Sequence, residues 1–132
     1  MTRIGIFGGA FDPIHYGHLL AAEQARESLE LSRILFAPVG EPPNRDKHLK
    51  STANHRQSMI ESAIADHPSF DLSRIDLDRP GPHYAVDTVR LIRHQFELSV
   101  DSCFLLIGSD HLPSFPTWYK AEQLMALCRF AT

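Results

Sequence analysis

Short apolar runs alternate along the chain with longer segments in which apolar residues recur every three or four positions. The short runs are typical of β-strands, and the longer spacing is typical of amphipathic helices. The pattern predicts five strands, over residues 3–8, 33–39, 70–78, 102–108 and the terminal "RFAT". It also predicts four helices, which begin near Gly17, after Ser51 or Thr52, after "RPGPHYAV" and at Ala121.

The first two helical segments each have one apolar side, which we expect to be buried. These sides consist of Leu19, Leu20, Ala22, Ala25 and Leu29 in the first helix and of Met59, Ile60, Ala63 and Ile64 in the second. Residues 70–78 alternate apolar and polar side chains, as a half-exposed strand near a sheet edge does. Residues 102–108 are apolar enough to predict a central strand that is covered on both faces.

Strands that alternate with helices predict an α/β fold in a single domain. We expect a Rossmann-like, doubly wound parallel sheet of about five strands with helices on both faces. In such sheets ligands bind beyond the carboxyl ends of the strands. Three segments rich in Gly, Pro or charge follow predicted strands: "GGAFDPIHYGH" from Gly8, "GEPPNRDKHLK" from Gly40 and "GSDH" from Gly108. All three are therefore predicted on one rim of the sheet.

Composition restricts the classes of partner. The chain has 132 residues, 43% of them apolar, and its 13 basic and 16 acidic side chains give a net charge of -3. That balance argues against nucleic acid or an anionic membrane as the main partner. No apolar run approaches the roughly 20 residues that span a bilayer, and "MTRIGIFGG" lacks the apolar core of a signal peptide, so we expect a cytoplasmic protein. Cys103 and Cys128 are expected to be buried free thiols.

The residue types from Gly8 to His18 predict a segment that can bind an anion. Gly8 and Gly9 allow close approach of the backbone and unusual dihedrals, and the helix that follows directs its positive end at the same space. His15 and His18 can donate hydrogen bonds to phosphate oxygens. Neither the P-loop pattern nor G-x-G-x-x-G is present. From these residues alone, a tight turn, a helix cap and a packed core histidine remain open as alternatives.

Beyond this, "GGAFDPIHYGHL" resembles the signature of the nucleotidylyltransferase superfamily, whose H-x-G-H motif matches residues 15–18. The segments "PVGEPP", "HRQSMIESAI", "RPGPHYAVDTV" and "LIGSDHLPSFPTWYKAEQL" extend the resemblance, in order, to bacterial nicotinate-nucleotide adenylyltransferases. That family transfers an adenylyl group from ATP to nicotinate mononucleotide, which gives deamido-NAD and pyrophosphate. The resemblance implies these two substrates, Mg²⁺ bound with ATP, and no metal held by the protein, and it leaves a homo-oligomer open.

The resemblance also implies roles for individual residues. His18 would contact the α-phosphate and His15 the leaving phosphates. The ATP-binding positions would be Gly8, Gly9, Ala10, Phe11, Arg45, Gly108 and Asp110, and those for the mononucleotide would be Ala85, Trp118 and Tyr119. Trp118 would stack on the nicotinate ring, and the amides near Ala85 and Tyr119 would hold its carboxylate.

The chain departs from the family in three places. Asn44 and Arg45 stand where His-Lys is usual, and Ala85 replaces the common Thr. Family members also continue beyond "RFAT" to a serine-rich segment and an Arg that bind the ATP phosphates, so we expect the nucleotidylyltransferase domain to be incomplete at its C-terminus.

Other functions stay open at this point. One is a non-catalytic nucleotide-binding fragment, and another is an adenylyltransferase for nicotinamide mononucleotide or phosphopantetheine. A third is a metal hydrolase that uses His15, His18, Asp110 and His111.

Overall fold

The computed structural model describes residues 2–42, 49–108 and 111–132, in which strands and helices alternate. The strands are β1 (Ile4–Gly9), β2 (Arg33–Pro38), β3 (Phe70–Leu72), β4 (Cys103–Leu106) and β5 (Arg129–Ala131). The α-helices are α1 (Tyr16–Ser28), α2 (Ala53–Ile64), α3 (Ala85–Phe96) and α4 (Ala121–Leu127). Two 3₁₀ segments, η1 (Val100–Ser102) and η2 (Leu112–Thr117), complete the order.

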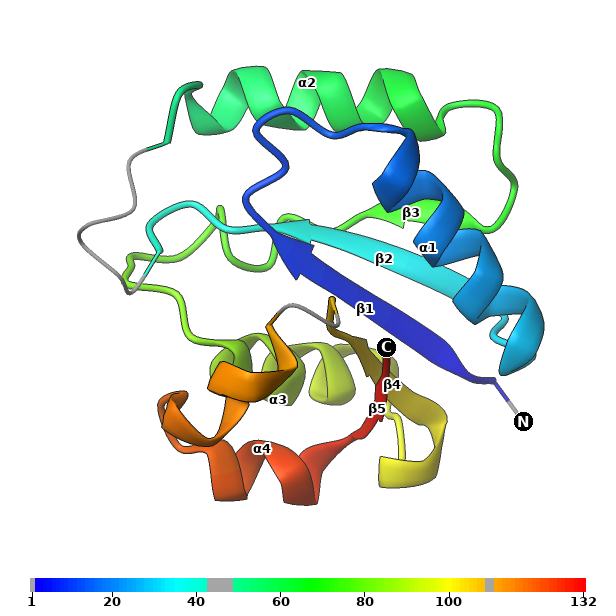
Figure 1. Ribbon diagram of the computed structural model, residues 1–132, viewed down its shortest axis with the longest axis vertical. Coiled ribbons are helices and arrows are strands. Elements are labelled where there is room, and N and C mark those ends of the chain that lie inside the picture. The colour runs from blue at the N-terminus through cyan, green and yellow to red at the C-terminus, as the bar shows by residue number, and fades with distance from the viewer. Residues whose placement is uncertain (1, 43–48, 109–110) are drawn as a thin grey trace.

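The strands form one parallel sheet in the order β3-β2-β1-β4-β5. The chain moves outward from β1 to β3, then crosses back to β4 and continues to β5 on the other side. Figure 1 shows α1 and α2 on one face of the sheet and α3 and α4 on the other. The predicted doubly wound α/β sheet is therefore confirmed, and its strand order reverses between β1 and β4.

Two apolar layers hold the helices to the sheet, because successive strand residues point to opposite faces. Ile4 and Ile6 of β1 pack in the layer with α3 and α4, whereas Phe7 packs in the layer with α1 and α2. The other strands alternate likewise: Leu105 belongs to the first layer and Phe104 to the second. Covering both faces explains why β1, β2 and β4 are apolar almost throughout.

Two positions on the predicted helix faces are exposed. Leu20 is 60% exposed and lies one turn from the exposed Tyr16, on the outer side of α1. Ala63 is also exposed, because the inner side of α2 follows a spacing of four residues through Arg56, Ile60 and Ile64. The apolar side predicted for α2 was wrong in placing Ala63 inside, and it missed a charged residue there.

The strand predicted over 70–78 is too long. Only Phe70–Leu72 pairs with β2, at the sheet edge as predicted, and residues 75–78 form a turn. The alternation continues past the strand because both Ile75 and Asp76 turn inward. Ile75 packs against the α3 layer, and the buried Asp76 carboxylate accepts from Thr88 Oγ1 at 2.9 Å.

Thr52 caps α2 as one of the two residues predicted for that role, and its hydroxyl accepts from the His55 amide at 3.2 Å.

The two thiols are buried and free, also as predicted, and burial raises the pKa of Cys103 to about 11 and that of Cys128 to about 12. Within the described residues, no helix is long and apolar enough to cross a membrane.

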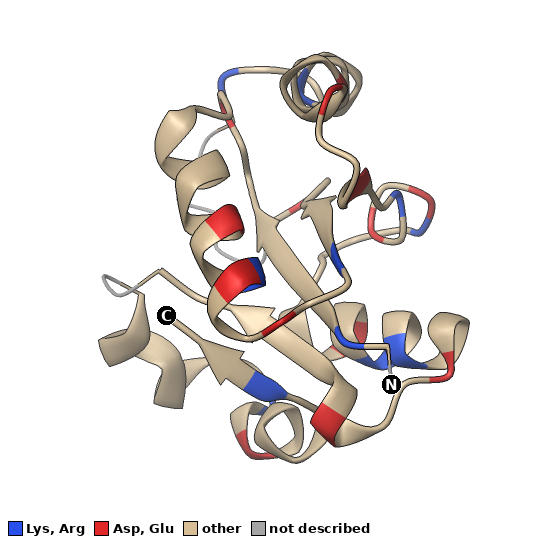
Figure 2. Ribbon diagram, turned by 90° about the vertical axis from the view of Figure 1, so that its right-hand side faces the viewer, with Lys and Arg blue, Asp and Glu red and all other residues tan. Residues whose placement is uncertain are grey.

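Acidic and basic positions are interspersed over the helices and loops rather than gathered on one side (Figure 2). One cluster ties α1 to the segment before β3. Glu23 accepts from Arg26 Nε at 3.1 Å and also from the His67 ring. The Ser69 amide donates to His67 Nδ1 at 3.1 Å, which leaves Nε2 to donate to Glu23. The hydrogen bond from Arg26, followed by that from His67, holds the pKa of Glu23 at about 2, against partial burial.

We predict that Glu23→Gln lowers the free energy of unfolding at pH 7 by about 1 kcal/mol, because the ionised carboxylate is lost from a partly solvated cluster. The Glu23 pKa lies below its ordinary value of 4.5, so this contribution is complete well above pH 4.5 and is lost as the pH falls through about 2. Urea unfolding across that range measures it. Glu27→Gln, an exposed neighbour on the same helix, is the control, and an equal effect of both substitutions would contradict the assignment.

Candidate active site

The segments that follow β1 and β2 meet at the carboxyl edge of the sheet. The Val39 amide donates to the Gly9 carbonyl at 2.9 Å, and the amides of Lys50 and Ser51 donate to Asp12. The turn before α3 joins them at the same edge (Figure 1), since the His83 amide donates to the Glu41 carbonyl at 2.9 Å.

Gly108 follows β4 at this edge, two positions beyond the last residue of that strand, and is exposed. In their described parts the three sequence segments therefore share one rim, as predicted. Asn44, Arg45 and Asp110 lie outside the described residues, so their predicted roles stay predictions.

Gly8 and Gly9 are not needed for unusual dihedrals, contrary to the sequence expectation. Among the described residues no glycine has a positive φ, and the left-handed conformation is taken instead by Phe11, at φ 50°. A Cβ at Gly8 would meet only the Ala37 carbonyl oxygen, at 3.9 Å. The use of glycine here is thus to leave open space above the backbone, where a ligand can approach closely.

The Phe11 ring offsets the strain of that backbone, because it is almost completely buried. It packs edge-on against Phe7, with ring centres 5.4 Å apart, and against His18, at 5.1 Å. The left-handed conformation of a non-glycine residue is costly and persists only where the surroundings enforce it. The turn after β1 is consequently held in one shape by an apolar cluster beneath it.

His15 and His18 lie together at the start of α1. Their rings stack with centres 3.8 Å apart, and the His15 amide donates to His18 Nδ1 at 3.1 Å. An Nδ1 that accepts leaves the proton of the neutral ring on Nε2, as a donor. Burial, followed by the charge of His15, lowers the pKa of His18. His18 is thus suited to donate one hydrogen bond as a neutral ring.

Gly17 has a steric reason to be glycine. A Cβ at this position would lie 2.9 Å from both Cε1 and Nδ1 of His15, closer than such contacts occur. Gly17 lies within α1, so its role is to make room for the His15 ring rather than to let the backbone bend. The two histidines and the glycine between them form one packed unit at the positive end of the helix.

Arg56 was missed by the sequence analysis, although it lies in the quoted segment "HRQSMIESAI". It is 1% exposed, and its guanidinium donates to the carbonyl oxygens of Ala10 at 2.9 Å, Val39 at 2.6 Å and Ser51 at 3.2 Å. Burial lowers its pKa, whereas the charge of Asp12 raises it. The one local signal was its spacing of four residues from Ile60 on the inner side of α2.

Asp12 links the turn after β1 to the segment before α2. Its carboxylate accepts from the Lys50 and Ser51 amides, and although burial opposes ionisation, these bonds lower the pKa of Asp12. Asp12 and Pro13 form a turn, and this turn is linked to the segment that leads into α2.

A second group of predicted residues gathers at the start of α3. Ala85 is the first residue of that helix, and the ring of the preceding Tyr84 lies 4.2 Å from that of Tyr119. Trp118 is half-buried at the end of η2, where its ring packs on Phe115 and its Nε1 donates to Ser114 Oγ at 3.3 Å. The structure thus brings Ala85, Trp118 and Tyr119 into one region of the α3 and α4 layer.

The described residues include no group of three or more His, Cys, Asp or Glu side chains close enough to hold a metal ion. His18 Nδ1 is also engaged by the His15 amide. The hydrolase alternative would therefore depend on Asp110, which is not described.

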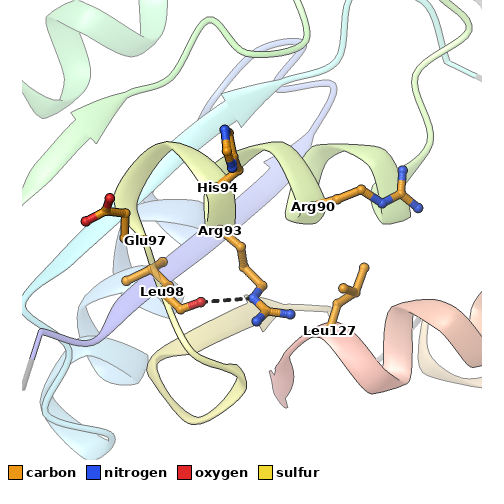
Figure 3. Close-up of a pocket in the computed structure, with 6 residues that line it drawn as sticks. All are labelled: Arg90, Arg93, His94, Glu97, Leu98 and Leu127. Atoms are coloured by element: carbon orange, nitrogen blue, oxygen red, sulfur yellow. Dashed lines mark hydrogen bonds between the residues drawn. The ribbon is translucent and has the colours of Figure 1, made fainter.

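A pocket of about 360 Å³ lies at the opposite end of α3 (Figure 3). It is lined by Arg90, Arg93, His94, Glu97, Leu98 and Leu127. Arg93 Nε donates to the Leu98 carbonyl at 3.1 Å, and Arg93 stands in the last turn of the helix, where a cation offsets its negative end. This pocket lies at the C-terminal end of α3, away from the candidate site at the N-terminal end of that helix.

Comparison with known proteins assigns the family. The model of the family described as "Cytidylyltransferase-like" matches residues 6–132. A Thermomicrobium roseum protein named "Probable nicotinate-nucleotide adenylyltransferase" is 42% identical over 127 residues, which cover 96% of this chain and 58% of that protein. A Bacillus pumilus protein of the same name is 38% identical over 130 residues, which cover 98% of this chain and 68% of that protein.

Solved structures agree on the fold. The Plasmodium falciparum nicotinic acid mononucleotide adenylyltransferase complexed with NaAD has a TM-score of 0.82 at 21% identity, over 98% of this chain and 63% of that chain. The present chain spans only 58 and 62% of the length of the first two curated relatives. With its sheet, its H-x-G-H segment and these matches, the chain belongs to the cytidylyltransferase-like family and, within it, is related to the nicotinate-nucleotide adenylyltransferases.

Proposed function

We propose that the protein transfers the adenylyl group of ATP to nicotinate mononucleotide in NAD biosynthesis, in the cytoplasm, and releases pyrophosphate. The observation that carries this proposal is the set of anion-binding groups at one rim: the His18 Nε2 donor, the open backbone at Gly8 and the N-terminus of α1. The names of the relatives supply the substrates.

The reaction is the attack of one phosphate on the α-phosphorus of another. The bond from the acceptor phosphate oxygen to the α-phosphorus forms while the bond to pyrophosphate breaks, and the pyrophosphate leaves with the electron pair. A phosphate is already a competent nucleophile, so catalysis consists of alignment and stabilisation of charge. His18 would donate to the α-phosphate and His15 to the leaving phosphates, as fixed donors that need no reorganisation.

The apolar surroundings of His18 strengthen this role. Phe7 and Phe11 pack against its ring, which limits water on that side of the imidazole. A hydrogen bond to an anion is worth more where water is excluded. The backbone amides of the turn after β1 would hold the remaining phosphate oxygens, and Gly108 and Asp110 would contact the ribose.

The mononucleotide would bind across β4 at the start of α3. The N-terminus of this twelve-residue helix has no side-chain cap, so the amides near Ala85 are available to a carboxylate. Trp118 would stack on the pyridine ring. Backbone donors favour an acid over its amide, because an amide directs its own NH₂ group at them.

Mg²⁺ would enter with ATP, since the described rim offers amides and imidazoles rather than a set of three carboxylates or histidines. When bound, it supplies positive charge to the phosphates. The chain's own groups orient those phosphates and donate to them.

A pyrophosphate-release assay with ATP and nicotinate mononucleotide tests the proposal, with nicotinamide mononucleotide in parallel. It is run on residues 1–132 and on a chimera that continues after Thr132 with the C-terminal segment of the Thermomicrobium roseum relative. Turnover of the acid by either version supports the proposal. Binding of ATP without turnover by both would favour the nucleotide-binding alternative, and a preference for the amide would contradict the substrate.

His18→Ala is predicted to lower kcat by about 10²- to 10³-fold, because one fixed donor to the reacting phosphate is lost. His55→Ala removes an exposed histidine at the start of α2 and serves as the matched control. Both are assayed by pyrophosphate release, and thermal unfolding verifies that each is folded. Turnover of His18→Ala within about threefold of the parent would refute the assigned role.

Trp118→Ala is predicted to raise KM for nicotinate mononucleotide by about tenfold while KM for ATP stays unchanged, because stacking on an aromatic ring is lost. Trp118→Phe should retain most of the affinity. The control is Phe96→Ala, an exposed aromatic residue at the far end of α3. A rise in KM for ATP alone would show that Trp118 does not contact the mononucleotide.

A further inference from the structure

Arg56 is the largest fully buried side chain of the described residues, and it stands on α2 rather than on the rim itself. Its three acceptors come from three different segments. Ala10 belongs to the turn after β1, Val39 follows β2, and Ser51 precedes α2. Each bond joins a charged donor to a neutral carbonyl, which is among the stronger kinds of hydrogen bond in proteins. One side chain therefore fixes the relative positions of three backbone segments at the phosphate side of the rim.

These bonds also fix the direction of two amides. In a trans peptide the C=O and the following N–H point in opposite directions. The Ala10 carbonyl points at the guanidinium, so the Phe11 N–H points away from it. The Val39 carbonyl does the same for the Gly40 N–H. In both segments the peptide carbonyl accepts from the buried arginine, so the N–H of the same peptide points away from the arginine.

The Phe11 amide has two further properties of a ligand-binding donor. It meets no acceptor among the residues that the structure describes, although an amide normally pairs. It also belongs to the residue with φ 50°, a conformation that side chains other than glycine rarely adopt. Strain of this kind is typical of positions where a binding geometry is held ready in advance.

We propose that Arg56 is a positioning residue for the ATP phosphates: by holding the Ala10 and Val39 carbonyls inward, it directs the Phe11 and Gly40 amides toward the phosphate oxygens. This rests on the proposed function, since it assumes that ATP binds at this rim. Arg56 acts through the backbone and makes no contact with ATP.

The proposal is tested in the 132-residue chain with Arg56→Met, Arg56→Lys and the control Thr52→Ala. Thr52→Ala removes the cap of the same helix and lowers stability without touching the three carbonyl bonds. Lysine keeps the charge but lacks the planar fork that reaches several acceptors. Amide resonances of the free protein report the orientation of Phe11 and Gly40, and calorimetric titration with Mg²⁺ and ATP reports affinity.

We expect Arg56→Met to move the Phe11 and Gly40 amide resonances and to weaken ATP binding by at least about tenfold, with Arg56→Lys intermediate. Thr52→Ala should leave those resonances in place and change ATP affinity by less than about twofold. If Arg56→Met fails to fold, Arg56→Lys supplies the comparison.

Resonances and affinities of the Arg56 variants that match those of Thr52→Ala would overturn the proposal, because Arg56 would then serve stability only. If the resonances move as expected but the unsubstituted chain itself binds no ATP, the proposed function fails while the positioning of the two amides stands.

Discussion

The guanidinium of Arg56 holds the rim of this protein in one shape. A parallel sheet brings the carboxyl ends of its strands to one edge, but it does not fix the turns beyond them. Here those turns are joined by charged and polar groups: Arg56 binds three carbonyls, and Asp12 accepts from two amides. A buried guanidinium must be paired, so any displacement of one turn leaves a donor unsatisfied. This penalty makes the arrangement specific.

The same logic extends across the sheet. His83 is buried, and its Nδ1 accepts from the Glu41 amide at 2.9 Å while its Nε2 donates to the Arg79 carbonyl at 2.9 Å. It therefore joins the segment after β2 to the turn that leads into α3. Arg56 attaches the segment after β2 to the turn after β1 and to the segment before α2. On the other side, His83 attaches it to the turn before α3. Apolar packing positions the helices, and hydrogen bonds from buried side chains position the loops.

Periodicity predicted the elements of the fold well, because both faces of the sheet are covered and its apolar residues follow the periods of strand and helix. Periodicity gave wrong predictions where contacts with distant parts of the chain decide burial or strand pairing. Leu20 fits an apolar face by spacing, yet its side chain is 60% exposed on the outer side of α1. Likewise, 70–78 has the alternation of a strand, although only its first three residues pair.

The grouping of the candidate site's segments at one rim was predictable for a different reason. His15 and His18 sit in a short motif whose parts touch one another, so the motif is visible in the sequence. Arg56 is invisible there because its acceptors lie 46, 17 and 5 positions away, and no local pattern marks a carbonyl as an acceptor. The reason for glycine at positions 8 and 17 was likewise a matter of space in three dimensions, near a ligand or a ring, rather than of backbone conformation.

The two apolar layers divide the proposed site between them. The histidine pair and Arg56 rest on the α1 and α2 layer, whereas Ala85, Trp118 and Tyr119 rest on the α3 and α4 layer, and the sheet separates the two layers. Each layer can therefore change its side chains without repacking the other. A fold organised in this way can acquire a new acceptor molecule by remodelling one face of its sheet while the groups proposed to bind the ATP phosphates, on the other face, remain the same.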